Sequence, residues 1–230
     1  MKKLITIIFT VLLIAIGLNA TSSKAPDMER IKTETTNPDS KYYYPALMER
    51  YERNETTMTA EDYRYLYYGY MFQEDYNPYR HSEYENIVQD LYYQASHTRA
   101  ECDSIIEYAE LSLKDNPFDL RQMSYLIYAL RTLKKTHRAN IWQYRLNHII
   151  EAIVSSGTGL DAENAWYIIN PKHEYDILNF SGLVAESQQY MEPYYDCITV
   201  KPRSETDTAT TYYFNIRHLL EEYYRKFPEE

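Results

Sequence analysis

The sequence predicts a mainly α-helical protein, in which tetratricopeptide-like antiparallel helical hairpins precede a small antiparallel β-sheet and a C-terminal helix. Apolar residues recur at helical spacing through the first two thirds of the chain, and beyond Gly157 and Gly159 they alternate as in strands. Within the segment 105–133, one helix ends at Asn116-Pro117 and another begins at once. No clean repeat accompanies this junction, so the tetratricopeptide likeness is one of architecture only.

The first twenty-five residues differ from the rest of the chain. Lys2 and Lys3 precede an apolar run from Leu4 to Leu18, and small residues follow it. This order is typical of a secretory signal peptide, with cleavage after Ala20 or Ala25. No later apolar run approaches the roughly 20 residues that a membrane-spanning helix needs. We therefore expect an exported, soluble protein that is periplasmic or extracellular.

The remaining chain is long enough for one domain with a sizeable core. We expect a helical region at 26–156 and a smaller α+β region at 157–230, packed together. Thr59 is expected to cap a helix through a capping box with Asp62. The apolar spacing predicts helices at about 26–35, 45–51, 60–72, 82–94, 98–116, 119–133, 138–155 and 219–227, and strands at about 165–170, 197–200 and 211–216.

Tyrosine is unusually frequent, with 27 in the chain, and the stretch EDYRYLYYGYMFQEDYNPYR at 61–80 is the densest part. In the helix predicted there, one apolar stripe is joined by a second, so most of its circumference is apolar. A tyrosine ring buries a large area while its hydroxyl reaches a carbonyl or water. We therefore interpret these tyrosines mostly as core, and Gly69 as the point of a close helix crossing.

Charge and composition exclude several functions. The formal net charge is −10, and it becomes −13 if cleavage follows Ala25, which disfavours binding to nucleic acid or anionic lipid. The few glycines are too scattered for a phosphate-binding loop. No histidine pair has the spacing that places two metal ligands on one helical face, so we expect neither metal nor cofactor.

Four segments carry a family resemblance: YYYPALMERY, TAEDYRYLYYGYMFQEDYNPYR, HEYDILNF and TTYYFNI, in this order. Together they resemble the domain-of-unknown-function 4919 family of secreted bacterial proteins, over nearly the whole mature chain. The stretch LYYGY followed by Y-x-P-Y is the most specific part. The resemblance implies an exported protein, and it implies no activity.

Two groups of residues are candidates for a functional site. His173, Glu174 and Asp176 bunch after a predicted strand and could supply acid/base chemistry, although a solvated turn after Pro171 explains them as well. The second group, at the end of the tyrosine stretch, suits sugar rings or peptides, and the alternative is that it fastens the loop to the core. It consists of Tyr76, Tyr79 and Arg80.

Cys102 and Cys197 are the two cysteines, and an exported protein could join them in a disulfide or bury them as separate thiols. The function that we predict is a non-enzymatic interaction or ligand-binding module of the cell envelope, with a protein or glycan partner. The alternative is an exported glycan or peptide hydrolase that uses the His173, Glu174 and Asp176 cluster.

Overall fold

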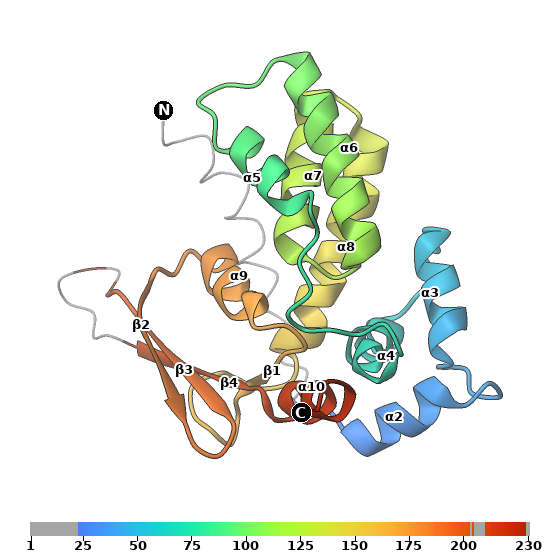
Figure 1. Ribbon diagram of the computed structural model, residues 1–230, viewed down its shortest axis with the longest axis vertical. Helices are drawn as coiled ribbons and strands as arrows, with labels where there is room; N and C mark the ends of the chain where they lie inside the picture. The colour runs from blue at the N-terminus through green and yellow to red at the C-terminus, as the bar shows by residue number, and fades with distance from the viewer. Residues whose placement is uncertain (1–22, 203, 205–209, 229–230) are drawn as a thin grey trace.

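The computed structural model describes residues 23–202, 204 and 210–228, so nearly all of the predicted signal peptide lies outside the described residues. The helices α6, α7 and α8 stand together, with α2–α4 on one side of their lower end and the sheet with α9 on the other (Figure 1). The α-helices are α2 (Met28–Thr36), α3 (Tyr44–Glu52), α4 (Ala60–Gly69), α5 (Glu85–Tyr92), α6 (Arg99–Asp115), α7 (Leu120–Thr132), α8 (Thr136–Val154), α9 (Lys172–Phe180) and α10 (Arg217–Lys226). The strands are β1 (Trp166–Tyr167), β2 (Ala185–Met191), β3 (Tyr195–Val200) and β4 (Thr210–Asn215).

The mainly helical class that the sequence predicts is confirmed. In α6–α8, consecutive helices pack against one another in alternating directions (Figure 1). A capping box begins α4, where Thr59 accepts from the backbone N–H of Asp62 and the Asp62 side chain accepts from the backbone N–H of Thr59. Thr98 and Glu101 form another at the start of α6. The tetratricopeptide character of the hairpins stays a prediction.

The tyrosines of α4 are core residues, as predicted. Tyr67 and Tyr68 are fully buried, and their hydroxyls form hydrogen bonds. The Tyr68 hydroxyl, for example, donates to the carbonyl of Ala152 over 3.1 Å. Gly69 lies where α4 crosses α2, because a Cβ atom there would come within 2.6 Å of Thr35 Cγ2. The predicted helix continues past Gly69 only as a 3-10 turn, Tyr70–Phe72.

The sheet has four strands in the order β1-β4-β3-β2, and it is mixed. β2, β3 and β4 pair antiparallel, whereas β1 runs parallel to β4. The prediction of three antiparallel strands was therefore incomplete: β1 is much shorter than the strand predicted at 165–170, and β2 was missed. The segment after Pro171 is not a solvated turn but the helix α9, whose polar side chains are largely buried.

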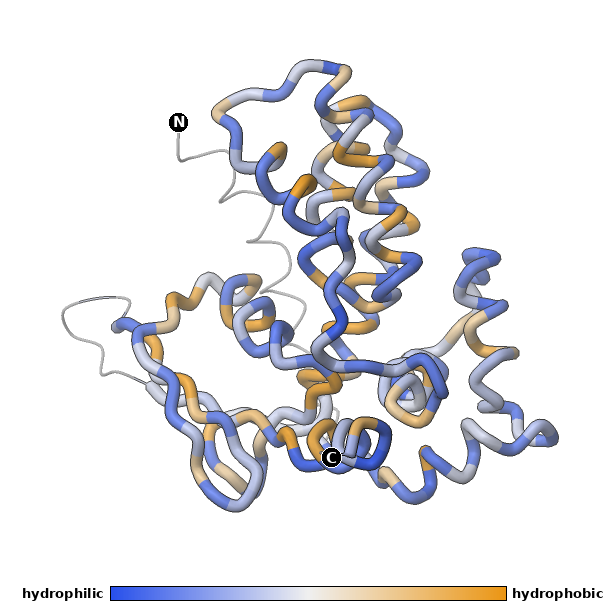
Figure 2. The backbone as a smooth tube through the Cα atoms, viewed as in Figure 1, coloured by the Kyte–Doolittle hydropathy of each residue, from blue (hydrophilic) through white to orange (hydrophobic). Residues whose placement is uncertain are grey.

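Both predicted regions contribute to one core. Buried residues from the helices and from the sheet, such as Leu66 and Phe214, belong to the same hydrophobic cluster. Hydrophobic and hydrophilic residues alternate along α6–α8 (Figure 2). Within the described part of the chain, no helix combines the length and the hydrophobicity needed to cross a membrane.

Candidate ligand-binding groove

His173 is a buried structural residue rather than an exposed acid or base. Its Nδ1 lies 2.7 Å from the Tyr67 hydroxyl, and its Nε2 lies 2.9 Å from the carbonyl oxygen of Phe118. Burial lowers the pKa of His173 to about 3, so the ring is neutral at ordinary pH. Nε2 then carries the proton for Phe118, and Nδ1 accepts from Tyr67, which itself accepts from the N–H of Ile169.

Glu174 and Asp176 take other partners, so α9 does not gather the three candidates around a common point. Glu174 is fully buried, and burial, followed by the charge and hydrogen bonding of Asp196, raises its pKa to about 9. Asp176 is 3% exposed and accepts from Arg121 Nη2 over 2.7 Å. Burial raises the pKa of Asp176 to about 6, against the opposing effect of Arg121. None of these side chains can touch a substrate in this conformation.

The three candidate binding residues of the loop, Tyr76, Tyr79 and Arg80, do not form a common binding site either. Tyr76 is 2% exposed and donates to the carbonyl of Ile169 over 2.6 Å, so it fastens the loop to the core. Arg80 donates to the backbone carbonyls of Asp75 and Asp115. Tyr79 alone stays accessible, with 44% of its surface exposed. Its ring packs edge-on against Tyr223 at 4.8 Å.

The two cysteines are buried as free thiols in the structure. Cys102 lies in α6 and Cys197 in β3, so the disulfide considered from the sequence is not formed here. Burial raises the pKa of both thiols, which keeps them protonated and poorly reactive.

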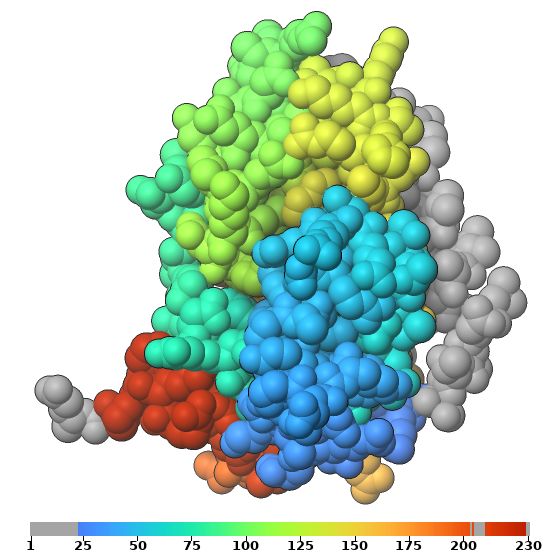
Figure 3. Space-filling view, turned by 90° about the vertical axis from the view of Figure 1, so that its right-hand side faces the viewer, coloured from blue at the N-terminus to red at the C-terminus, as the bar shows by residue number. Residues whose placement is uncertain are grey.

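A groove of about 850 Å³ lies elsewhere, between α3, α6 and α8. These helices share the face shown in Figure 3, with α3 in blue, α6 in green and α8 in yellow. Its aromatic and aliphatic lining comprises Tyr44, Met48, Tyr51, Tyr70, Ile106, Leu111, Leu113, Pro117 and Trp142. Its charged lining comprises Glu52, Asp75, Asp103, Glu107, Glu110, Lys114 and Arg145.

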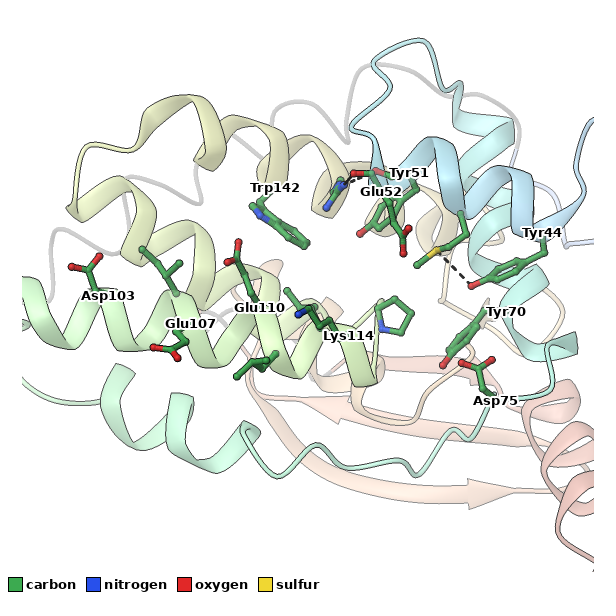
Figure 4. A pocket seen from close by; sticks show the side chains of 16 residues that line it. Tyr44, Tyr51, Glu52, Tyr70, Asp75, Asp103, Glu107, Glu110, Lys114 and Trp142 are labelled. Carbon is green, nitrogen blue, oxygen red and sulfur yellow. Dashed lines mark hydrogen bonds between the residues drawn. The ribbon is translucent and has the colours of Figure 1, made fainter.

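Two walls face each other across this groove. Trp142, Tyr51 and Glu52 lie on one side, and Glu107, Glu110 and Lys114 lie on the α6 side (Figure 4). On α6, the charged residues follow one another at intervals of three or four, which places them along one helical face.

Arg145 holds the first wall together from α8. Its guanidinium carbon lies 4.2 Å from the centroid of the Tyr51 ring and 4.5 Å from that of Trp142, so it is sandwiched between the two. Its Nη2 donates to the backbone carbonyl of Tyr51, and over 2.7 Å to Asn54 Oδ1. The positive charge is thereby buried in aromatic and carbonyl surroundings, which tie α8 to the end of α3.

Comparisons with known proteins place the chain in a family. Residues 29–225 match the family model described as "Domain of unknown function (DUF4919)", which spans most of the sequence. The chain belongs to the DUF4919 family. Neither the curated proteins nor the solved structures contain a match to it.

The groove of this DUF4919 domain carries unbalanced negative charge. Asp103 pairs with Lys135 over 2.9 Å, and Glu110 pairs with Arg138. Among the described residues, no cationic partner is recorded for three further carboxylates at the rim, all exposed: Glu52, Asp75 and Glu107. Lys114 is an exposed cation of the same lining, on the α6 wall with Glu107. Two buried donors of the first wall, Tyr51 Oη and Arg145 Nε, lack a hydrogen-bond partner among the residues that the structure describes.

Sequence reasoning missed this groove because its walls come from helices far apart in the chain. A partial signal was present in α6, where Glu107, Glu110 and Lys114 form a charged stripe beside an apolar one. Such a stripe is normally a solvated helix face. Only the packing of α3 and α8 opposite α6 turns it into one wall of a groove.

Proposed function

We propose that this DUF4919 protein is an exported, non-enzymatic binding module that holds an extended segment of a partner protein, rich in basic side chains, in the groove between α3, α6 and α8. The observation that carries the proposal is the set of unpaired carboxylates Glu52, Asp75 and Glu107 around an aromatic floor. Basic side chains of a ligand would form ion pairs with these carboxylates, for which the described part of the protein supplies no cation.

The dimensions of the groove support a ligand of this kind. About 850 Å³ lies within the range of roughly 300–1,000 Å³ that is usual for ligand sites. A second hollow of about 680 Å³ continues around α3 and shares Tyr44, Met48, Glu52 and Asp75 with the first. It adds Glu49 and Glu74, so the acidic character extends along the path. A long, open and acidic path suits an extended peptide better than a compact ligand.

Charge favours a peptide over the glycan partner that the sequence also left open. Aromatic rings beside carboxylates can bind sugars, since hydroxyl groups donate to carboxylate oxygens and ring faces stack. A neutral glycan would nevertheless leave the negative charge of Glu52, Asp75 and Glu107 unbalanced. A lysine- or arginine-containing peptide balances it, and its apolar side chains can cover Trp142 and Met48.

Fluorescence anisotropy with two labelled peptides tests the proposal. One peptide alternates lysine with leucine, and the other alternates glutamate with leucine. We expect only the lysine peptide to bind, and Glu107→Gln to weaken it by about 1.4- to 5-fold, the effect of one exposed ion pair. Glu186→Gln, an exposed change on β2 away from the groove, is the matched control. Equal binding of both peptides, or equal losses in the two variants, would contradict the proposal.

The hydrolase alternative is less well supported. Its candidate residues His173, Glu174 and Asp176 are at most 3% exposed. A substrate would reach them only if α9 moved away from its neighbours, which would break the bonds to Phe118 and Arg121. The raised pKa of Glu174 suits a general acid, yet burial, with the charge and hydrogen bonding of Asp196, explains it as a structural feature.

A further inference from the structure

Tyr51 and Arg145 line the groove, and their buried donors Tyr51 Oη and Arg145 Nε have no acceptor within the described part of the chain. Tyr51 is 4% exposed and Arg145 is 7% exposed, and the two donor atoms themselves are closed to water, so a ligand reaches them only when neighbouring side chains of the groove move aside. A buried polar atom without a partner is destabilising, and in native structures it calls for an explanation. One explanation is a ligand that supplies the missing acceptor.

Both donors are held in place before any ligand arrives. The Tyr51 ring packs edge-on against Tyr63 at 6.2 Å and against Phe118 at 5.9 Å. Arg145 is fixed by its stacking on Tyr51 and by its bond to Asn54. The two donors therefore belong to one stacked unit, and these two side chains lose little conformational entropy when an acceptor binds.

The charges around this unit select the kind of acceptor. Glu52 and Glu110 line the groove next to it, so an incoming carboxylate or phosphate would be repelled. Burial raises the pKa of Tyr51 to about 12, so its hydroxyl keeps its proton and remains a donor at ordinary pH. A neutral acceptor fits both facts, and an extended peptide offers one at every residue in its main-chain carbonyl oxygen.

We propose that Tyr51 Oη and Arg145 Nε form a subsite that binds a main-chain carbonyl oxygen of the peptide in the groove. This inference rests on the proposed peptide-binding function and adds a role for two named atoms. The acidic rim then recognises the basic side chains, while this subsite fixes the peptide backbone and sets its register along α3.

The variant Tyr51→Phe tests the subsite, because it removes only the unpartnered hydroxyl. We expect its melting temperature to equal or exceed that of the wild type, since a buried unsatisfied group is lost. Its affinity for the lysine–leucine peptide should fall about 2- to 12-fold, which is the effect of one neutral hydrogen bond. Tyr144→Phe is the matched control, because that hydroxyl already donates to the carbonyl of Met58 over 3.2 Å. It should lose stability and keep its affinity.

The outcomes separate this inference from the function on which it rests. If the wild type binds no basic peptide, the proposed function fails. If it binds, and Tyr51→Phe binds equally well, the subsite alone is wrong. A lower melting temperature for Tyr51→Phe would also overturn the subsite, since it would show that the hydroxyl has a partner inside the protein. Replacing single peptide bonds of the ligand by esters, which weakens one carbonyl acceptor at a time, should show one position where the effect disappears in Tyr51→Phe.

Discussion

The carboxyl group of Glu174 lies at the contact between α9 and the sheet, where it interacts with Asp196 and lies 3.4 Å from Gln188 Nε2. Its pKa is raised from 4.5 to about 9, chiefly by burial. The folded protein therefore keeps a proton that the unfolded chain releases between these two values. The contribution of this group to stability is fully present below pH 4.5 and is lost as the pH rises toward about 9.

Glu174→Gln should remove this loss, because glutamine mimics the neutral carboxyl and cannot ionise. Between pH 5 and pH 8 the wild type should lose about 1.4 kcal/mol of unfolding free energy per pH unit relative to the variant. Urea unfolding at several pH values measures the difference, with the exposed change Glu186→Gln as control. Parallel pH profiles for wild type and Glu174→Gln would show that Glu174 is ionised in the folded state.

The contribution of His173 to stability has the opposite pH dependence. Its pKa falls from 6.5 to about 3, so its contribution is present above pH 6.5 and is lost as the pH falls toward 3. The sequence placed both residues together as candidate acid/base groups. It could not show that the two face different partners, because Tyr67, Phe118 and Asp196 lie far from α9 in the chain.

Individual helices were largely predictable from the sequence, and the exceptions have physical causes. The helix α9 was missed because its buried positions include His173, Glu174 and Asp176, which hide the apolar periodicity. The strand β2 was missed because it is an edge strand with mostly exposed, polar residues, so its alternation carries no hydrophobic signal. In α9, tertiary partners satisfy polar side chains that local patterns would leave in solvent, and β2 forms because its backbone pairs with β3 while its side chains stay exposed.

The crossing of α2 and α4 depends on Gly69. An added Cβ would lie 2.6 Å from Thr35 Cγ2, a distance that real side chains do not adopt. Gly69→Ala should therefore destabilise the protein by about 1–3 kcal/mol through overpacking, despite a gain in helix propensity of about 1 kcal/mol. Thermal unfolding followed by circular dichroism measures this. The double variant Gly69→Ala/Thr35→Ala lacks the clashing Cγ2 and should recover part of the lost stability. Equal melting temperatures of this double variant and of Gly69→Ala alone would contradict the clash.

At the scale of the whole molecule, tyrosine hydroxyls join the helical and α+β regions. Tyr68 reaches the carbonyls of Ala152 and Tyr167, and Tyr76 reaches that of Ile169. The sequence indicated a tyrosine-rich core from its stripes, but not which carbonyls receive the hydroxyls. The groove was beyond sequence reasoning for the same reason: Tyr51, Glu107 and Trp142 meet only when α3 packs beside the α6–α8 layer.

The N-terminal end of the described chain is fastened to the folded domain through Lys24. Its backbone N–H donates to the carbonyl of Ser155 over 3.0 Å, and its carbonyl accepts from Arg64 Nη2. Arg64 Nη1 also donates to Ser155 Oγ over 2.9 Å. Cleavage after Ala20 keeps Lys24 and these bonds, whereas cleavage after Ala25 removes it. We therefore expect the exported form to begin at Thr21.

Intact-mass measurement of the protein secreted by a bacterial host checks this expectation directly. A chain that begins at Pro26 should unfold about 1–3 kcal/mol more easily than one that begins at Thr21, because the two hydrogen bonds made by the Lys24 backbone, to Ser155 and to the Arg64 side chain, are lost. Arg64→Lys should reduce the difference in stability between the two chains, because it weakens the bond to the Lys24 carbonyl, which only the longer chain can form. A secreted mass that corresponds to Pro26, with equal stability of the two chains, would show that Lys24 contributes nothing to the mature fold. Retention of the uncleaved chain in the cytoplasm would contradict export itself.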